Sequence, residues 1–199
     1  MAPLLIGKDL SLEFPTRNVL KGVTLGIEEG DRIGIVGKNG DGKSSLLRLL
    51  AAELAPDSGE VTKRSDVTVG KLDQNDALDP DLTALEAATE QAAGFEWAAE
   101  RKTREIIEEL LKDIDYDARV STLSGGQRRR VSLARLLIGN WDILMLDEPT
   151  NHLDMEAIAW LANHLKQRWP GATGALLVVT RDRWFLDEVC TTMWEVHDR

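Results

Sequence analysis

The chain has 199 residues, of which 43% are hydrophobic and 29% are charged, so it is long enough to bury a core without a disulfide or a structural metal. Its net charge of −10 argues against broad nucleic-acid affinity, because neutralising phosphates requires clustered lysine and arginine. The single Cys190 excludes an internal disulfide, and we see no secretory signal and no apolar run that could enter a bilayer, so we expect a cytoplasmic protein.

The first forty residues read as strands and turns that lead into a glycine-rich loop. Apolar and polar residues alternate at 10–14 and 23–27, as on half-buried strands, and 33–36 is a short apolar strand. Gly37–Ser44 then fits the pattern G-x-x-x-x-G-K-[ST], and the leucines of 45–54 predict an amphipathic helix. A preceding strand and a following helix are the context that a phosphate-binding loop requires.

Each residue type of this loop has a chemical reason. The glycines let successive backbone N–H groups point at phosphates, and the helix start adds its positive dipole end. Lys43 supplies a mobile positive charge, and the Ser44 hydroxyl is expected to coordinate Mg²⁺. We expect the Asp41 side chain to face away, because a carboxylate would oppose phosphate binding. The residues expected to bind ATP here are Gly37, Lys38, Asn39, Gly40, Asp41, Gly42, Lys43, Ser44 and Ser45.

The middle of the chain changes from strands to helices. Residues 61–74 favour strands, 83–112 favour helices, and Ser124 is a plausible N-cap for a further helix. We therefore expect a helical subdomain over approximately 76–138. Arg128-Arg129-Arg130 is the only dense basic cluster, and two interpretations stay open: a helix start with its own ion pairs, or a local contact with nucleic acid.

The last third of the chain alternates strands and helices again. Residues 143–146 form a continuous apolar run, as expected for a strand buried on both faces of a parallel sheet, and 175–179 form a second one. Asp147 follows the first of these strands and is expected to hold Mg²⁺, and Glu148 is expected to orient and polarise an attacking water.

The pentapeptide Leu123–Gln127 resembles the signature motif of ATP-binding-cassette (ABC) proteins, and the other motifs follow in that family's order. The resemblance implies an α/β P-loop NTPase fold of ABC type, with a mostly parallel core sheet, an antiparallel β subdomain and a helical insert, in one nucleotide-binding domain over 1–199. It implies that Gln74 helps to sense Mg²⁺ and the γ-phosphate and that Leu153-Asp154 contacts an opposing domain. Phe14 lies where the family stacks an aromatic on adenine, although a strand phenylalanine can equally be core.

The resemblance also implies a mechanism in which two cassettes share two ATP molecules. The signature residues of one cassette contact the nucleotide that its partner holds, so an isolated domain should be a weak ATPase. The partner would be a second cassette, in the same longer chain or in a homodimer. The signature residues are Ser124, Gly125, Gly126 and Gln127.

Within the family, Asn151-His152 is typical of the ABC-F group, soluble tandem-cassette proteins that act on ribosomes. The chain would then be the first cassette of such a protein. The alternative is the ATPase motor subunit of a membrane transporter. A chromosome- or repair-type ATPase is disfavoured, because 83–112 leaves no room for a long coiled coil.

Arg181 departs from the family, which places a switch histidine at this position. Arginine can donate to a γ-phosphate, but it cannot accept a hydrogen bond or lose its charge near neutral pH. We therefore expect normal ATP binding with slow or altered hydrolysis. The other interpretation is a tolerated substitution that points to solvent.

Overall fold

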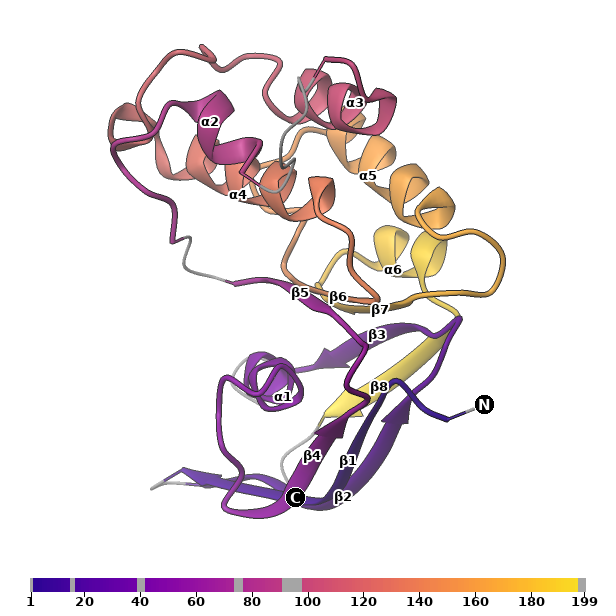
Figure 1. Ribbon diagram of the computed structural model, residues 1–199. Helices are drawn as coiled ribbons and strands as arrows, with labels where there is room; N and C mark the ends of the chain where they lie inside the picture. The colour runs from indigo at the N-terminus through magenta and orange to yellow at the C-terminus, as the bar shows by residue number, and fades with distance from the viewer. Residues whose placement is uncertain (1, 15–16, 39–41, 74–76, 91–97, 197–199) are drawn as a thin grey trace. The chain divides into compact units, whose positions relative to one another are not determined.

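The computed structural model describes residues 2–14, 17–38, 42–73, 77–90 and 98–196, and these fall into two compact units (Figure 1). Unit 1 comprises Met1–Lys71, Trp141–Glu148 and Leu165–Arg199. Unit 2 comprises Leu72–Asn140 and Pro149–His164. The single domain with a helical subdomain over approximately 76–138 stays a prediction.

Unit 1 contains a three-stranded antiparallel sheet in the order β2-β1-β4. Its strands are β1 (Leu5–Phe14), β2 (Arg17–Ile27) and β4 (Ser58–Lys63). Leu10 and Leu12 of β1 are buried, whereas the intervening Ser11 is partly exposed, which agrees with the alternation in the sequence.

A five-stranded sheet forms the other layer of unit 1, in the order β5-β6-β7-β3-β8. Its strands are β3 (Arg32–Gly37), β5 (Val69–Leu72), β6 (Ile143–Asp147), β7 (Ala175–Val179) and β8 (Thr192–Val196). β3 pairs in parallel with both β7 and β8, and β6 pairs in parallel with β7. Every residue of β6 and β7 is buried, so the two continuous apolar runs are strands of a parallel sheet, as predicted.

Helix α1 (Lys43–Leu50) fills the core of unit 1, and α6 (Arg183–Val189) belongs to the same unit. Four leucines of α1 are buried in one cluster with side chains of both sheets: Leu46, Leu47, Leu49 and Leu50. Burying such a side chain contributes about 1.5–3 kcal/mol, so the leucines that follow the glycine loop hold the helix, and with it the end of the loop, in place.

The described part of unit 2 is helical. It contains α2 (Ala84–Ala88), α3 (Arg101–Leu110), a 3₁₀ turn at Val120–Thr122, α4 (Gly125–Ile138) and most of α5 (Met155–Gln167). Helix α4 packs against both α2 and α3. In the described ranges, no helix combines the length and hydropathy that a bilayer crossing needs.

Candidate functional site

Two of the predicted motifs follow strands that end at the same edge of the five-stranded sheet. β3, β7 and β6 are consecutive neighbours and run parallel, so the segments after Gly37, Val179 and Asp147 emerge together at the carboxyl edge. β7 separates the strand of the glycine loop from the strand that ends at Asp147, and it places Thr180 and Arg181 between the two motifs. Ligands of open α/β sheets bind at this edge.

The glycine loop is built against strand β2. Gly42 precedes α1 with a φ of 97°, and a Cβ at this position would come within 2.1 Å of Val19 Cγ1. Only glycine fits both the backbone angle and the close approach. The Lys43 ammonium group donates a hydrogen bond to the Gly37 carbonyl oxygen at 2.5 Å, which joins the two ends of the loop. Asn39, Gly40 and Asp41 lie outside the described residues, as does the predicted orientation of Asp41.

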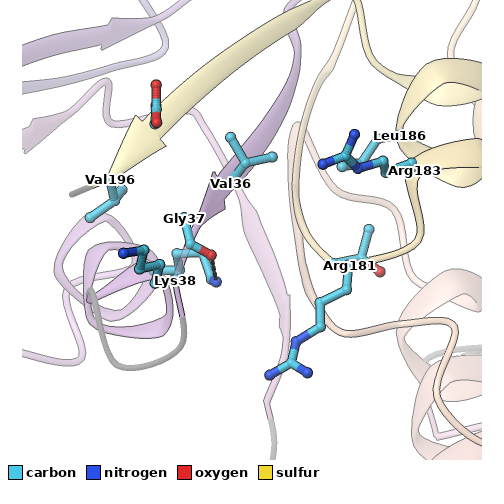
Figure 2. A pocket seen from close by; sticks show the side chains of 10 residues that line it. Val36, Gly37, Lys38, Arg181, Arg183, Leu186 and Val196 are labelled. Atoms are coloured by element: carbon cyan, nitrogen blue, oxygen red, sulfur yellow. Dashed lines mark hydrogen bonds between the residues drawn. The ribbon is translucent and has the colours of Figure 1, made fainter.

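A pocket of about 520 Å³ opens beside this loop (Figure 2). Four of its lining side chains are cationic, namely Lys38, Lys43, Arg181 and Arg183, and Glu195 is the one carboxylate. In Figure 2 the arginines reach in from the segment after β7, and Gly37 and Lys38 lie across from them. This excess of positive charge favours a polyanionic ligand in an otherwise acidic protein.

Asp147 and Glu148 differ sharply in their surroundings. Asp147 is 3% exposed at the end of β6, and Glu148 follows with a φ of 51°, unusual for a residue with a side chain. The Glu148 amide donates to the Val179 carbonyl oxygen at 2.7 Å, which holds the turn against β7. Burial and the neighbouring Asp147 charge raise the pKa of Glu148, and the positive charge of Arg181 and a side-chain hydrogen bond with Thr180 partly oppose this rise.

Arg181 therefore lies within electrostatic reach of Glu148. Its side chain is exposed and lines the cationic pocket, so it has room to contact a ligand there. Both interpretations of the substitution stay open, because an exposed side chain that lines the pocket can face a ligand or solvent, and the effect of Arg181 on hydrolysis stays a prediction.

The signature pentapeptide in unit 2 forms the start of α4. The Ser124 hydroxyl accepts a hydrogen bond from the Gln127 amide at 3.1 Å, and the Gln127 side chain accepts one from the Ser124 amide at 2.9 Å. This reciprocal capping box confirms the predicted helix start. A Cβ at Gly125 would meet nothing within 4 Å, so this glycine presents an open backbone.

The three arginines after the signature are either buried or bonded to other groups of unit 2. Arg128 donates to the carbonyl oxygens of Val120 and Ser121, each at 3.1 Å. Arg129 is 7% exposed, and Arg130 forms a two-pronged ion pair with Asp113. These contacts support the interpretation of the basic cluster as a helix start with its own partners.

The segment predicted to contact an opposing domain lies before α5. Asp154 Oδ1 accepts a hydrogen bond from the Ala157 amide at 2.8 Å and so caps the helix. Asn151 and His152 are both exposed, and His152 has a φ of 65°. His152 lies in the loop before α5. No cluster of three or more histidine, cysteine or acidic residues suited to a metal occurs among the described residues.

Two predicted site residues, one for adenine and one for Mg²⁺, are not among the residues that line this pocket. Phe14 is 39% exposed at the end of β1, and it is not among the pocket-lining residues. Gln74 lies outside the described residues. The structure adds Thr180, Arg183 and Glu195 to the candidate site, and no local pattern in the sequence singles them out.

A family model described as "ABC transporter" matches residues 20–151, which include the glycine loop, the signature and the Asp147-Glu148 pair. The chain belongs to the ABC family. ABC cassettes are ATPases, so the cation-lined pocket and the adjacent carboxylates have the chemistry that the family requires.

Three relatives show similarity over most of this ABC cassette. The putative ATP-binding protein YdiF of Bacillus subtilis is 34% identical over 230 positions, covering 94% of this chain and 35% of YdiF. The energy-dependent translational throttle protein EttA of Escherichia coli K12 is 35% identical over 220 positions, covering 92% and 39%. EttA of Mycobacterium tuberculosis H37Rv is 37% identical over 215 positions, covering 89% and 38%.

The chain spans between one third and two fifths of the length of these relatives. Each alignment is longer than the 199 residues of the cassette, so each relative carries inserted residues that this chain lacks.

A solved structure described as the ATP-binding subunit of an ABC transporter has a TM-score of 0.80, at 23% identity, covering 98% of this chain and 86% of that one. This similarity confirms the predicted fold class. The roles of the individual site residues stay predictions.

Proposed function

We propose that the cassette binds Mg·ATP in the cationic pocket, hydrolyses it slowly, and closes with a second cassette around the nucleotide. The observation that supports this proposal best is the grouping of Lys43, Arg181 and Glu148 at one edge of the five-stranded sheet. A polyphosphate needs the two cations, and hydrolysis needs the carboxylate.

The glycine loop binds the phosphates through its backbone. On binding, the Lys43 ammonium group exchanges the Gly37 carbonyl oxygen for phosphate oxygens, which are stronger acceptors because they are charged. Arg181 donates to the γ-phosphate and stabilises the negative charge that develops during its transfer. Exposed Phe14 stacks on the adenine ring.

The Ser44 hydroxyl and the Asp147 carboxylate would hold the Mg²⁺ ion, with Gln74 as a further ligand. Ser44 lies in the first turn of α1 and Asp147 ends β6, and both supply the oxygen ligands that Mg²⁺ prefers. Such a short ligand set fits a metal that is bound mainly through substrate phosphates and water. When bound, the ion neutralises charge on those phosphates.

Glu148 is the general base. Its carboxylate orients the attacking water and accepts a proton as the water's oxygen bonds to the γ-phosphorus and the bond to the ADP oxygen breaks. A pKa raised by burial makes Glu148 a stronger base than an exposed glutamate, and the Val179 carbonyl oxygen fixes its backbone. Because Arg181 stays charged near neutral pH, it holds the γ-phosphate without exchanging a proton with Glu148.

The partner is a second cassette. The open backbone at Gly125 and the capped start of α4 suit an anion that another chain carries, as the resemblance implies for Ser124 to Gln127. ATP drives the association because it is bound more tightly in the closed pair than in the open one.

We further propose that the cassette belongs to a cytoplasmic ABC-F protein that acts on the ribosome. This proposal rests on Asn151-His152 and on the two EttA relatives, whose names describe a translational throttle. The transporter motor is the alternative. The similarity to the solved transporter subunit does not favour this alternative, because at 23% identity it supports only a shared fold.

Glu148→Gln should trap the closed state. Sedimentation of this variant with and without Mg·ATP measures whether it dimerises and so tests the proposal. We expect ATP-dependent association, and Lys43→Met should abolish it. A Glu148→Gln chain that binds ATP and stays monomeric would refute the shared site. Cosedimentation of Glu148→Gln with ribosomes in ATP then separates the two functions, because a transporter motor has no reason to bind them.

A further inference from the structure

The two motif-bearing segments of unit 2 lie side by side. A Cβ built on Gly126 would lie 3.2–3.4 Å from the side chain of His152, so the signature turn passes close to the loop before α5 and leaves no free space for a larger residue. The backbone of Gly126 is not left-handed, so the backbone angle does not require glycine here. The close approach of His152 requires it, because a side chain would take up the space between the two segments. The signature and the loop before α5 thus form one continuous surface within unit 2.

Lys112 holds the loop side of this surface. It lies two residues beyond the end of α3, and its ammonium group is 3.2 Å from Asp154 Oδ2. The other oxygen of Asp154 caps α5 through the Ala157 amide, so one carboxylate joins Lys112 to the helix start. Glu109 and Glu156 lie 3.5 Å and 3.8 Å from the same ammonium group.

The charges explain why Lys112 matters more than an ordinary surface lysine. A single exposed ion pair contributes little to stability. Lys112, however, lies among three carboxylates, and these would repel one another without it. A hydrogen bond with Asp154 raises the pKa of Lys112. The pKa of Asp154 is lowered mainly by the hydrogen bond that its carboxylate accepts from the Ala157 amide, and next by the hydrogen bond with Lys112.

The next residue in the chain holds the signature side. Asp113 pairs with both terminal nitrogens of Arg130, which lies on α4, and Arg130 also donates to the Leu110 carbonyl oxygen at 3.4 Å. Consecutive residues therefore reach in two directions, Lys112 to α5 and Asp113 to α4. Both helices begin at a motif that is expected to meet a partner.

We propose that Lys112 and Asp113 form a clamp that fixes the loop before α5 relative to the signature helix, and that Lys112 is a positioning residue for nucleotide-driven association. The inference rests on the proposed function, because the surface that the clamp assembles is the one offered to a second cassette. Lys112 is not among the residues that line the cationic pocket beside the glycine loop. The clamp therefore affects association and leaves ATP binding by the monomer unchanged.

Association measures the clamp directly. In the Glu148→Gln background with Mg·ATP, Lys112→Met should weaken dimerisation by on the order of tenfold in sedimentation equilibrium. Lys112→Arg should restore it, because the charge is kept. Lys166→Met is the matched control: it removes another lysine that pairs with one glutamate, Glu188 in unit 1, and it should leave dimerisation unchanged.

A second measurement uses the monomer and does not depend on dimerisation. Hydrogen exchange of the Ala157 and Ile158 amides, which bond to the side chain and the backbone of Asp154, should speed up in Lys112→Met and not in Lys166→Met. Asp154→Asn keeps a capping side chain but removes the charge, so Lys112→Met should have a smaller effect in that background.

The outcomes separate the two ideas. Unchanged exchange in Lys112→Met overturns the clamp, whether or not the chain dimerises. Faster amide exchange in Lys112→Met, in a chain that never dimerises in the presence of Mg·ATP, supports the clamp and refutes the shared nucleotide site. If Lys112→Met loses ATP affinity in proportion to dimerisation and Lys112→Arg does not rescue it, Lys112 has only a structural role and the proposal is wrong.

Discussion

Replacing Gly42 with alanine tests how the glycine loop is held against strand β2. The new Cβ would lie 2.1 Å from Val19 Cγ1, far inside van der Waals contact, and Val19 itself is 6% exposed and cannot move into solvent. The residue must also keep a φ of 97°, which an L side chain rarely adopts.

These two effects can be given magnitudes. A left-handed backbone costs alanine about 1–2 kcal/mol, and forcing an extra methyl group into a packed core costs about 1–3 kcal/mol. We therefore expect Gly42→Ala to lower the free energy of unfolding by about 2–5 kcal/mol. Gly22→Ala is the matched control, because Gly22 also has a positive φ, 60°, but its Cβ would meet nothing within 4 Å.

Urea unfolding of both variants measures the difference. Gly42→Ala should exceed Gly22→Ala by the clash alone, about 1–3 kcal/mol. The same amount should appear as a coupling energy in a double-mutant cycle with Val19→Ala, which removes the clashing Cγ1 atom. Equal destabilisation by the two glycine variants, together with no coupling to Val19, would show that the new Cβ does not clash with Val19.

Three further predictions concern the site and the core. Arg181→His should raise the ATP turnover of the associated chain severalfold with little change in ATP affinity, and no gain in rate would contradict the proposed role of Arg181. The rate of ATP hydrolysis should fall as pH falls through the raised pKa of Glu148, because the protonated carboxyl cannot accept a proton. Arg181→Met removes a positive charge that lowers this pKa, so the acidic limb of the pH–rate profile should move to higher pH. A limb that does not move would contradict the electrostatic coupling of Arg181 to Glu148. Burial raises the pKa of the Cys190 thiol to about 12, leaving about a thousandfold less thiolate at pH 8 than in an ordinary cysteine, so iodoacetamide should label the native chain far more slowly than the urea-unfolded chain.

The sequence predicts those parts of the fold that depend on local pattern. Residues 143–146 and 175–179 are continuous apolar runs, and both are strands in which every residue is buried. Ser124 has the side chain of an N-cap, with Gln127 three residues later, and both hydrogen bonds of the capping box form. In these cases the residue type alone specifies the local structure.

The remaining features depend on contacts between distant segments. Nothing in 175–181 states that β7 lies between β3 and β6, although this order brings Arg181 within electrostatic reach of Glu148. Lys112 reads as one more charge at the end of a charged helix until α5 brings Asp154 to within 3.2 Å of it. The sequence therefore predicts the motifs, whereas the tertiary fold decides which side chains support them.

The internal contacts of the arginines after the signature also affect how a protein containing this cassette could meet RNA. Binding to RNA releases counterions only where cations are available to phosphates, and Arg128 and Arg130 already donate to carbonyl oxygens and to a carboxylate. The slope of log affinity against log salt for a ribosome complex would then be set by cations other than Arg128 and Arg130. Replacing Arg128 with an uncharged residue should leave that slope unchanged. Its only effect should be a lower stability of unit 2.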